Sequence, residues 1–211
     1  MTKEIRSFEL TDVEVRETQG EGEARTLTGY ASVFDSPSVN LGGFIERVAP
    51  TAFTRSLKAA AEGESNIFAL WAHDSSQPLG STGGGKLSLE ADEKGLRFSL
   101  DVARMTPAQL DAARDGELRM SFGFSVRHDE WTEGEDGLPL RTLVDVDLFE
   151  VSPVISPAYP DTSAALRSLD EWRSAESKPE PKVRADQTKE FQELRTRLLK
   201  RFAEYKINRG E

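Results

Sequence analysis

A serine and a histidine are the two side chains of this sequence with the clearest potential for chemistry. The chain contains two histidines and no cysteine, so few pairs of a nucleophile and a base can be formed. Ser121 lies in a run of alternating polar and apolar residues from Arg119 to Val126, and His73 follows an apolar run that begins at Ile67. If the two segments meet in space, His73 can serve as the general base for Ser121. The pattern therefore suggests a serine hydrolase.

The alternation around Ser121 predicts which way its side chain points. Met120, Phe122 and Phe124 share one face of the expected strand, and Ser121 shares the other face with Gly123. If the apolar face is turned toward the core, Ser121 is exposed beside a glycine that does not block the approach of a substrate. Serine on the polar face of a strand is also common, so this spacing leaves a plain surface position open.

The two histidines allow different interpretations. His73 stands at a strand end before Asp74, where an imidazole can act as a base near neutral pH, or where it can be hydrogen-bonded without any chemical role. His128 is followed by Asp129 and Glu130 and is interpreted as solvated surface. Two distant histidines without cysteine are a poor zinc site, so we expect neither a metal ion nor another cofactor.

A third residue has to orient the imidazole of His73, and the segment 143–151 offers candidates. Glu150 has the same parity as the apolar Val146 and Leu148, and a carboxylate on an apolar face must be paired because its burial is costly. This makes Glu150 a candidate partner for an imidazole N–H. It can equally reach solvent past a bulge near the strand end. Asp147 is the reserve candidate.

Short strands and two helices are expected to position these residues. A helix is predicted from Pro50 to about Glu62. A second helix is predicted with Thr106 as N-cap, Pro107 as its first residue and Gly116 just past its end. The other expected elements are strands over 5–16, 26–34 and 66–73, a glycine-rich loop over 79–85, and hairpins that pair 87–91 with 96–102 and 119–132 with 140–151.

The composition indicates one domain followed by an appendage. We expect a main domain over 1–169, a charged linker with prolines over 170–186, and an amphipathic helical tail over 187–211 with apolar residues at helical spacing. The net charge of −10 disfavours nonspecific binding to nucleic acid. No apolar run reaches the length of a membrane span, and the first residues do not resemble a signal peptide, so we expect a soluble cytoplasmic protein.

Five blocks of the sequence occur in an order that resembles the prohead serine proteases of tailed phages. The blocks lie within about residues 25–165 and are Gly29–Phe34, Glu46–Phe53, Trp71–Asp74, Met120–Phe124, and Leu148–Val154 with Pro157–Pro160. That family is related in fold to assemblin, the capsid-maturation protease of herpesviruses. The resemblance therefore implies the α+β class, mainly a β barrel flanked by helices, to which this chain adds its C-terminal helical tail.

The resemblance also implies a function. Members of the family are serine endopeptidases that act inside the assembling prohead in the host cytoplasm, cleave the scaffold protein and the major capsid protein, and usually cleave themselves. By position, Ser121 is the implied nucleophile and His73 the implied base. Assemblin uses a second histidine as the third member, whereas His128 lies only seven residues past Ser121, so Glu150 is expected in that role. Capsid and scaffold proteins, and further copies of the chain, are the expected partners; nucleic acid and membranes are not.

Two other functions are compatible with parts of this pattern. The first is a catalytically inactive scaffold or assembly protein of the procapsid with the same fold, and it differs from the protease in whether Ser121 and His73 are within hydrogen-bond reach. The second is a ligand-binding β domain. It predicts an aromatic groove, but the tryptophans and tyrosines are scattered along the sequence.

Overall fold

The structure, a computed structural model, describes residues 3–8, 14–17, 25–134, 137–155 and 163–176. Contacts within the chain divide it after Asp170, and each side is considered by itself. The first residues of the expected linker, 170–176, belong to helix α3 (Ser163–Glu176). The rest of that linker and the expected tail helix over 187–211 lie outside the described residues.

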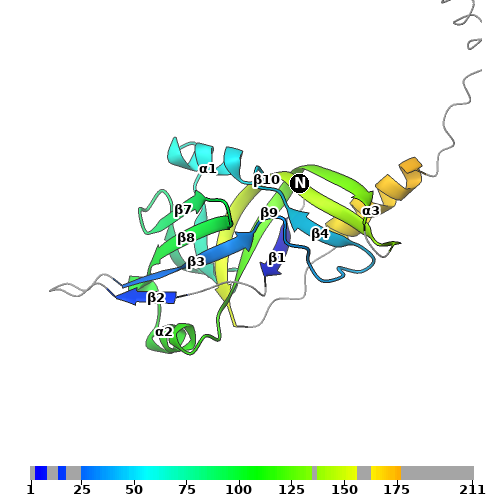
Figure 1. Cartoon of the computed structure of the whole chain (residues 1–211). Coiled ribbons are helices and arrows are strands. Elements are labelled where there is room, and N and C mark those ends of the chain that lie inside the picture. The colour runs from blue at the N-terminus through cyan, green and yellow to red at the C-terminus, as the bar shows by residue number, and fades with distance from the viewer. Residues whose placement is uncertain (1–2, 9–13, 18–24, 135–136, 156–162, 177–211) are drawn as a thin grey trace, which may run out of the picture. The chain divides into compact units, whose positions relative to one another are not determined.

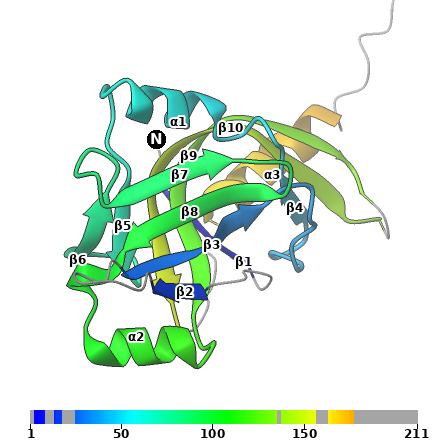
Figure 2. The same cartoon turned by 60° about the vertical axis from the view of Figure 1, so that its left-hand side comes forward.

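The described strands form two sheets, which we name sheet A and sheet B. Sheet A has the order β1 (Glu4–Phe8), β9 (Arg119–Glu133), β10 (Pro139–Val154), β5 (Phe68–Trp71) and β6 (Asp74–Ser81), and β4 (Ile45–Val48) also pairs with β10. Sheet B has the order β2 (Glu14–Glu17), β3 (Arg25–Val33), β8 (Gly95–Asp101) and β7 (Leu87–Ala91). Figures 1 and 2 show the long β9–β10 hairpin running behind the strands of sheet B.

The α+β class with mostly strands is confirmed, but the described strands do not close into the expected barrel. One hydrophobic core joins Phe122 and Phe124 of sheet A with Leu27, Phe98 and Leu100 of sheet B. Each sheet buries an apolar face against the other, as in a layered fold. Because this packing already removes the apolar faces from water, the sheets do not need to be joined edge to edge.

The hairpin of β9 and β10 forms the centre of sheet A. Both strands are found close to their predicted ranges, and β10 is long enough to serve two parallel neighbours. Its first half pairs with β4 and its second half with β5. Parallel neighbours require long connections, so segments far apart in the sequence meet along β10.

Helices α1 and α2 lie at opposite ends of the sheets (Figures 1 and 2). Helix α2 (Pro107–Arg114) has the predicted start, with a capping box between Thr106 and Gln109, and Gly116 past its end has a φ of 72°. Helix α1 (Thr54–Ala61) begins later than predicted. Phe53 ends the turn before it and is fully buried edge-on against Phe122, so packing of this ring decides where the helix starts.

Three predicted segments were wrong in their bounds. The expected strand over 5–16 is two strands, because β1 pairs with β9 in sheet A whereas β2 pairs with β3 in sheet B. The expected strand over 66–73 ends at Trp71, where the chain turns back as β6. That strand, Asp74–Ser81, takes up the first part of the expected glycine-rich loop. The partner of β1 is distant in sequence, whereas β2, β5 and β6 are delimited by pairing with a strand that is adjacent along the chain.

We expect Thr106→Ala to destabilise the fold, because it removes the side-chain acceptor that caps the backbone N–H of Gln109. The free energy of unfolding, measured by urea denaturation, should fall by about 1 kcal/mol. Thr132→Ala, at an exposed position of β9, is the matched control and should change it by less than about 0.5 kcal/mol. Equal effects of the two substitutions would contradict a capping role.

Candidate active site

His73 is presented by a strained two-residue turn between β5 and β6. Trp71 pairs with Asp74 across the hairpin, and the two residues between them, Ala72 and His73, have φ angles of 49° and 64°. Positive φ at both central positions is typical of a type I′ turn, which normally carries asparagine or glycine. Strain in residues that are not glycine is often found at functional sites. The turn is held by the backbone N–H of Ala72, which donates to the carbonyl of Pro153.

Ser121 is buried, which corrects the expectation that it is exposed. It lies on the face of β9 opposite to Phe122, as the alternation predicted, but its exposed fraction is 0%. The reason is a neighbour that the sequence did not reveal. β1 pairs with β9 in a register that sets Ser7 opposite Ser121, while Ser152 of β10 stands opposite on the other side. Three serines therefore lie side by side across sheet A.

Glu150 reaches the face of Ser121 because of a β-bulge in β10. Leu148 pairs with Phe124 and Glu150 pairs with Gly123, so Phe149 is an extra residue without a partner on β9. A bulge shifts the alternation of every later side chain by one position. Phe149 is accordingly 41% exposed and Glu150 only 2%. The expectation that Glu150 shares the face of Val146 is therefore wrong. A bulge is present, as in the alternative interpretation, but Glu150 is buried and does not reach solvent.

Ser121, His73 and Glu150 are connected by hydrogen bonds, and we call them the Ser121 cluster. The Nε2 atom of His73 lies 2.8 Å from the Oγ of Ser121, and its Nδ1 atom lies 2.8 Å from Oε1 of Glu150. With the proton on Nδ1, the imidazole donates to the carboxylate and its Nε2 can accept the hydroxyl proton of Ser121. The arrangement can thus activate a serine oxygen as a nucleophile.

Further contacts hold the carboxylate of Glu150 in place. Ser152 donates to its Oε2 atom over 2.5 Å, and Lys3 Nζ lies 3.1 Å from its Oε1 atom. Burial by itself raises the pKa of Glu150, but the hydrogen bonds from His73 and Ser152 outweigh it and leave the pKa below its usual range. Glu150 is therefore a carboxylate that stays ionised and can stabilise a positive charge on His73.

Gly123 leaves the space in which Glu150 lies. A Cβ atom at this position would come within 2.2 Å of Oε1 of Glu150 and 2.5 Å of the Cε atom of Lys3. From the alternation alone, Gly123 is expected to leave an opening for substrate next to Ser121. The structure instead explains it as room for the carboxylate, because Glu150 crosses directly over its partner residue on β9.

The other two sequence candidates are placed away from the Ser121 cluster. Asp147 pairs with Arg127 and Arg55, each over 2.8 Å. Burial by itself raises the pKa of Asp147. Its hydrogen bonds with the two arginines lower the pKa by more than burial raises it, so the pKa lies below its usual range. His128 has a mostly exposed side chain 3.7 Å from Glu130, as expected of a surface residue.

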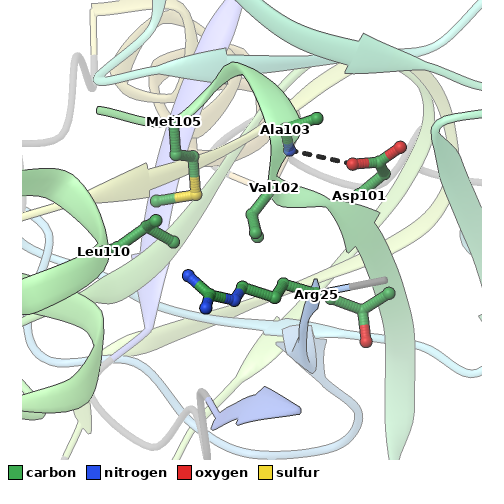
Figure 3. A pocket seen from close by; sticks show the side chains of 7 residues that line it. Arg25, Asp101, Val102, Ala103, Met105 and Leu110 are labelled. Carbon is green, nitrogen blue, oxygen red and sulfur yellow. Dashed lines mark hydrogen bonds between the residues drawn. The ribbon is translucent and has the colours of Figure 1, made fainter. Parts of the chain in front are cut away.

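A separate pocket of about 450 Å³ lies where the start of β3, the short helix η1 (Val102–Arg104) and α2 meet. Figure 3 shows Arg25 pointing along its floor, with Met105 and Leu110 on the side of α2. Its carboxylate, Asp101, already accepts hydrogen bonds from the backbone of Ala103 and from Lys86. None of the lining residues belongs to the Ser121 cluster.

Comparison with known protein families shows to which family this chain is related. The family model of the caudovirus prohead serine protease matches residues 11–175. This chain belongs to that family. The match includes every member of the Ser121 cluster, and membership indicates a serine protease and supports a role in the maturation of phage capsids. No curated protein and no solved structure matches the chain.

Within the described part of the chain, the helices are too short or too polar to cross a membrane. A phage prohead protease acts inside the procapsid in the host cytoplasm.

We expect Gly123→Ala to lower the reactivity of Ser121. The new methyl group must displace the carboxylate of Glu150, and His73 then loses the hydrogen bond that holds its imidazole in place. A misplacement of about 1 Å can cost about 100-fold in rate, and the rate at which a fluorophosphonate labels Ser121 should fall by about that factor. Gly84→Ala is the control, since its Cβ would meet only Ser81 in an exposed turn, the Oγ at 3.0 Å and the main-chain oxygen at 3.7 Å. Unchanged labelling of the Gly123 variant would show that the carboxylate does not have to lie there.

Proposed function

We propose that this chain is a serine endopeptidase that cleaves scaffold protein and major capsid protein, and also itself, during maturation of the prohead of a tailed phage. Ser121 is the nucleophile, His73 the general base, and Glu150 the residue that orients and stabilises the imidazole. The observation that carries the proposal is the continuous hydrogen-bonded chain from Ser121 through His73 to Glu150, with both distances at 2.8 Å.

The mechanism follows from this chain of contacts. His73 takes the hydroxyl proton through Nε2 as the Oγ of Ser121 attacks a peptide carbonyl. The imidazolium that forms is stabilised by the ionised carboxylate of Glu150. His73 then gives the proton to the leaving amine, an acyl-enzyme remains on Ser121, and a water molecule activated by His73 releases it. The proposed triad therefore ends in a glutamate where assemblin has a second histidine.

The geometry favours this proposal over an inactive assembly protein. A scaffold needs neither a strained turn at His73 nor a buried glutamate beside it. Ala72 and His73 both have positive φ, and conformations of this kind cost of order 1–3 kcal/mol each. Burial of Glu150 adds a further penalty that only its partners offset. Features that reduce stability are expected where they serve the reaction.

The proposal predicts that Ser121→Ala abolishes proteolysis. When the chain is co-expressed with its capsid and scaffold proteins, intact mass should show cleaved products for the wild type and uncleaved chains for the variant. The loss of rate should be roughly 10⁶-fold. Ser125→Ala, on the same face of the same strand and equally buried, is the matched control and should still cleave. If the wild type also leaves every co-expressed chain intact, the protein is not a protease under these conditions and the assembly role replaces ours.

Glu150→Gln should lower kcat on the order of 10⁴-fold, because an amide cannot stabilise the imidazolium as the carboxylate does. The same substitution has a signature in stability. The pKa of Glu150 is lowered in the folded state, so the ionised group stabilises the fold above its unfolded pKa of about 4.3. That contribution is lost as the pH falls through the lower folded pKa. The difference in unfolding free energy between wild type and variant, measured in urea, should narrow toward acidic pH; a constant difference would contradict it.

A further inference from the structure

Strand β1 covers the edge of β9 that carries the nucleophile. It pairs antiparallel with β9, and Ser7 donates a hydrogen bond to the Oγ of Ser121 over 3.0 Å. Just before the strand, Lys3 lies against Glu150 at 3.1 Å. One short segment therefore touches two members of the Ser121 cluster. Because Ser121 is fully buried, no other peptide can reach it while β1 stays in this position.

The hydroxyl of Ser121 has two acceptors within reach. It donates to the main-chain oxygen of Arg6 over 2.8 Å, and Nε2 of His73 lies at the same distance from the same Oγ. A hydroxyl has one hydrogen, so the carbonyl of Arg6 competes with the base for it. Attack on this group requires the Oγ of Ser121 to turn from the carbonyl oxygen, to which it donates, toward the carbonyl carbon. β1 thus places a peptide carbonyl beside the nucleophile, as a substrate strand must.

The side chain of Arg6 enters a buried charged site made by other strands. Its Nε atom lies 2.6 Å from Oε1 of Glu46 on β4, and a terminal nitrogen lies 3.2 Å from Oε2. Arg141 on β10 contacts Glu46 at 3.0 Å and Asp129 at 2.7 Å. All these side chains except Asp129 are 2–3% exposed.

The charge of this site selects its occupant. Without β1, the site contains the two carboxylates of Glu46 and Asp129 and one guanidinium, that of Arg141. Glu46 and Asp129 then share one guanidinium, and incomplete pairing of a buried carboxylate is costly, so a positive charge from an occupant stabilises Glu46. Arg6 supplies this charge. Glu4 of the same strand pairs with Arg6 over 2.6 Å and contacts Arg141 over 3.1 Å. The family match begins at residue 11, after β1, so the matched region contains Glu46 and Arg141 but not the strand that fills the site.

We propose that β1 occupies the substrate-binding edge of the enzyme. Substrates pair there as an extended strand antiparallel to β9, and Glu46 selects a basic side chain in the residue whose carbonyl meets Ser121. This inference rests on the proposed function. It makes the bond between Arg6 and Ser7 the first one that Ser121 cleaves, within its own chain.

The reaction balances without any further reagent than water. The Oγ of Ser121 attacks the carbonyl carbon of Arg6, and His73 takes the hydroxyl proton and passes it to the nitrogen of Ser7 as the C–N bond breaks. Residues 1–6 remain as an ester on Ser121. Water hydrolyses the ester, leaving a carboxylate on Arg6 and a free amine on Ser7. The edge of β9 is then open to a substrate strand from another chain, which is cleaved in trans.

The test uses the full chain and two synthetic peptides of residues 1–12, one with arginine and one with leucine at position 6. We expect intact mass to show that the wild type loses its first six residues while Ser121→Ala keeps them. The processed enzyme should cleave the arginine peptide after position 6. Its rate of cleavage of the leucine peptide should be lower by at least a factor on the order of 100. In the full chain, Arg6→Lys should preserve the self-cleavage. Arg16→Leu, at an exposed position of β2, is the control and should cleave at the wild-type rate.

A fluorophosphonate that labels reactive serines distinguishes failure of the substrate edge from failure of the proposed protease activity. If Ser121 is labelled or cleaves capsid protein while the bond after Arg6 stays intact, or if both peptides are cleaved equally, the substrate edge is overturned and the protease remains. If Ser121 is neither labelled nor able to cleave any of these chains, both proposals are overturned. Because the peptides require no substitution in the folded protein, the selectivity is tested even if variants at Arg6 do not fold.

Discussion

The Ser121 cluster depends on one irregular pairing between β9 and β10. In a regular hairpin, Glu150 would follow Leu148 onto the core face, where two phenylalanines of β9 already lie. The extra residue Phe149 shifts the register, so that Glu150 and Ser152 instead share a face with Ser121. A bulge is a small local change, but the period of two in a strand makes it decide the direction of every side chain beyond it. Gly123 completes the arrangement by leaving the carboxylate its space.

His73, the proposed base, reaches this face from a different part of the chain. β5 pairs in parallel with the last third of β10, next to Glu150, and the turn after it points His73 back over the hairpin. A type I′ turn made from alanine and histidine is less favourable than one made from asparagine and glycine. The hydrogen bonds of His73 with Ser121 and Glu150, and that of Ala72 with Pro153, offset this strain. The turn between β5 and β6 is thus the source both of the position of His73 and of the strain in its backbone.

Sheet A also contains polar interactions on both of its faces near β1. On one face lie the serines and the Ser121 cluster, and on the other lie the ion pairs of Arg6, Glu46 and Arg141. Burial by itself lowers the pKa of Arg141, but Glu46 and Glu4 beside it raise the pKa above its usual value, so the guanidinium stays charged. Buried ion pairs add little net stability because desolvation offsets their attraction. Their arrangement is what makes them informative, since they place the positive Arg6 of β1 against Glu46 and the negative Glu4 of β1 against Arg141.

Local sequence determined the elements whose signals are local. The capping residues of α2, the alternation of β9, and the hairpin of β7 and β8 could all be predicted, because caps, turns and side-chain alternation depend on neighbouring residues. The candidate nucleophile and base could also be named from the sequence, since a chain with two histidines and no cysteine offers few bases. Only the tertiary structure decided that β1 buries Ser121, that a bulge turns Glu150 toward His73, and that the sheets pack in layers. Each of these depends on pairing or packing between residues far apart in the sequence, which is set by contacts and hydrogen bonds that no local pattern contains.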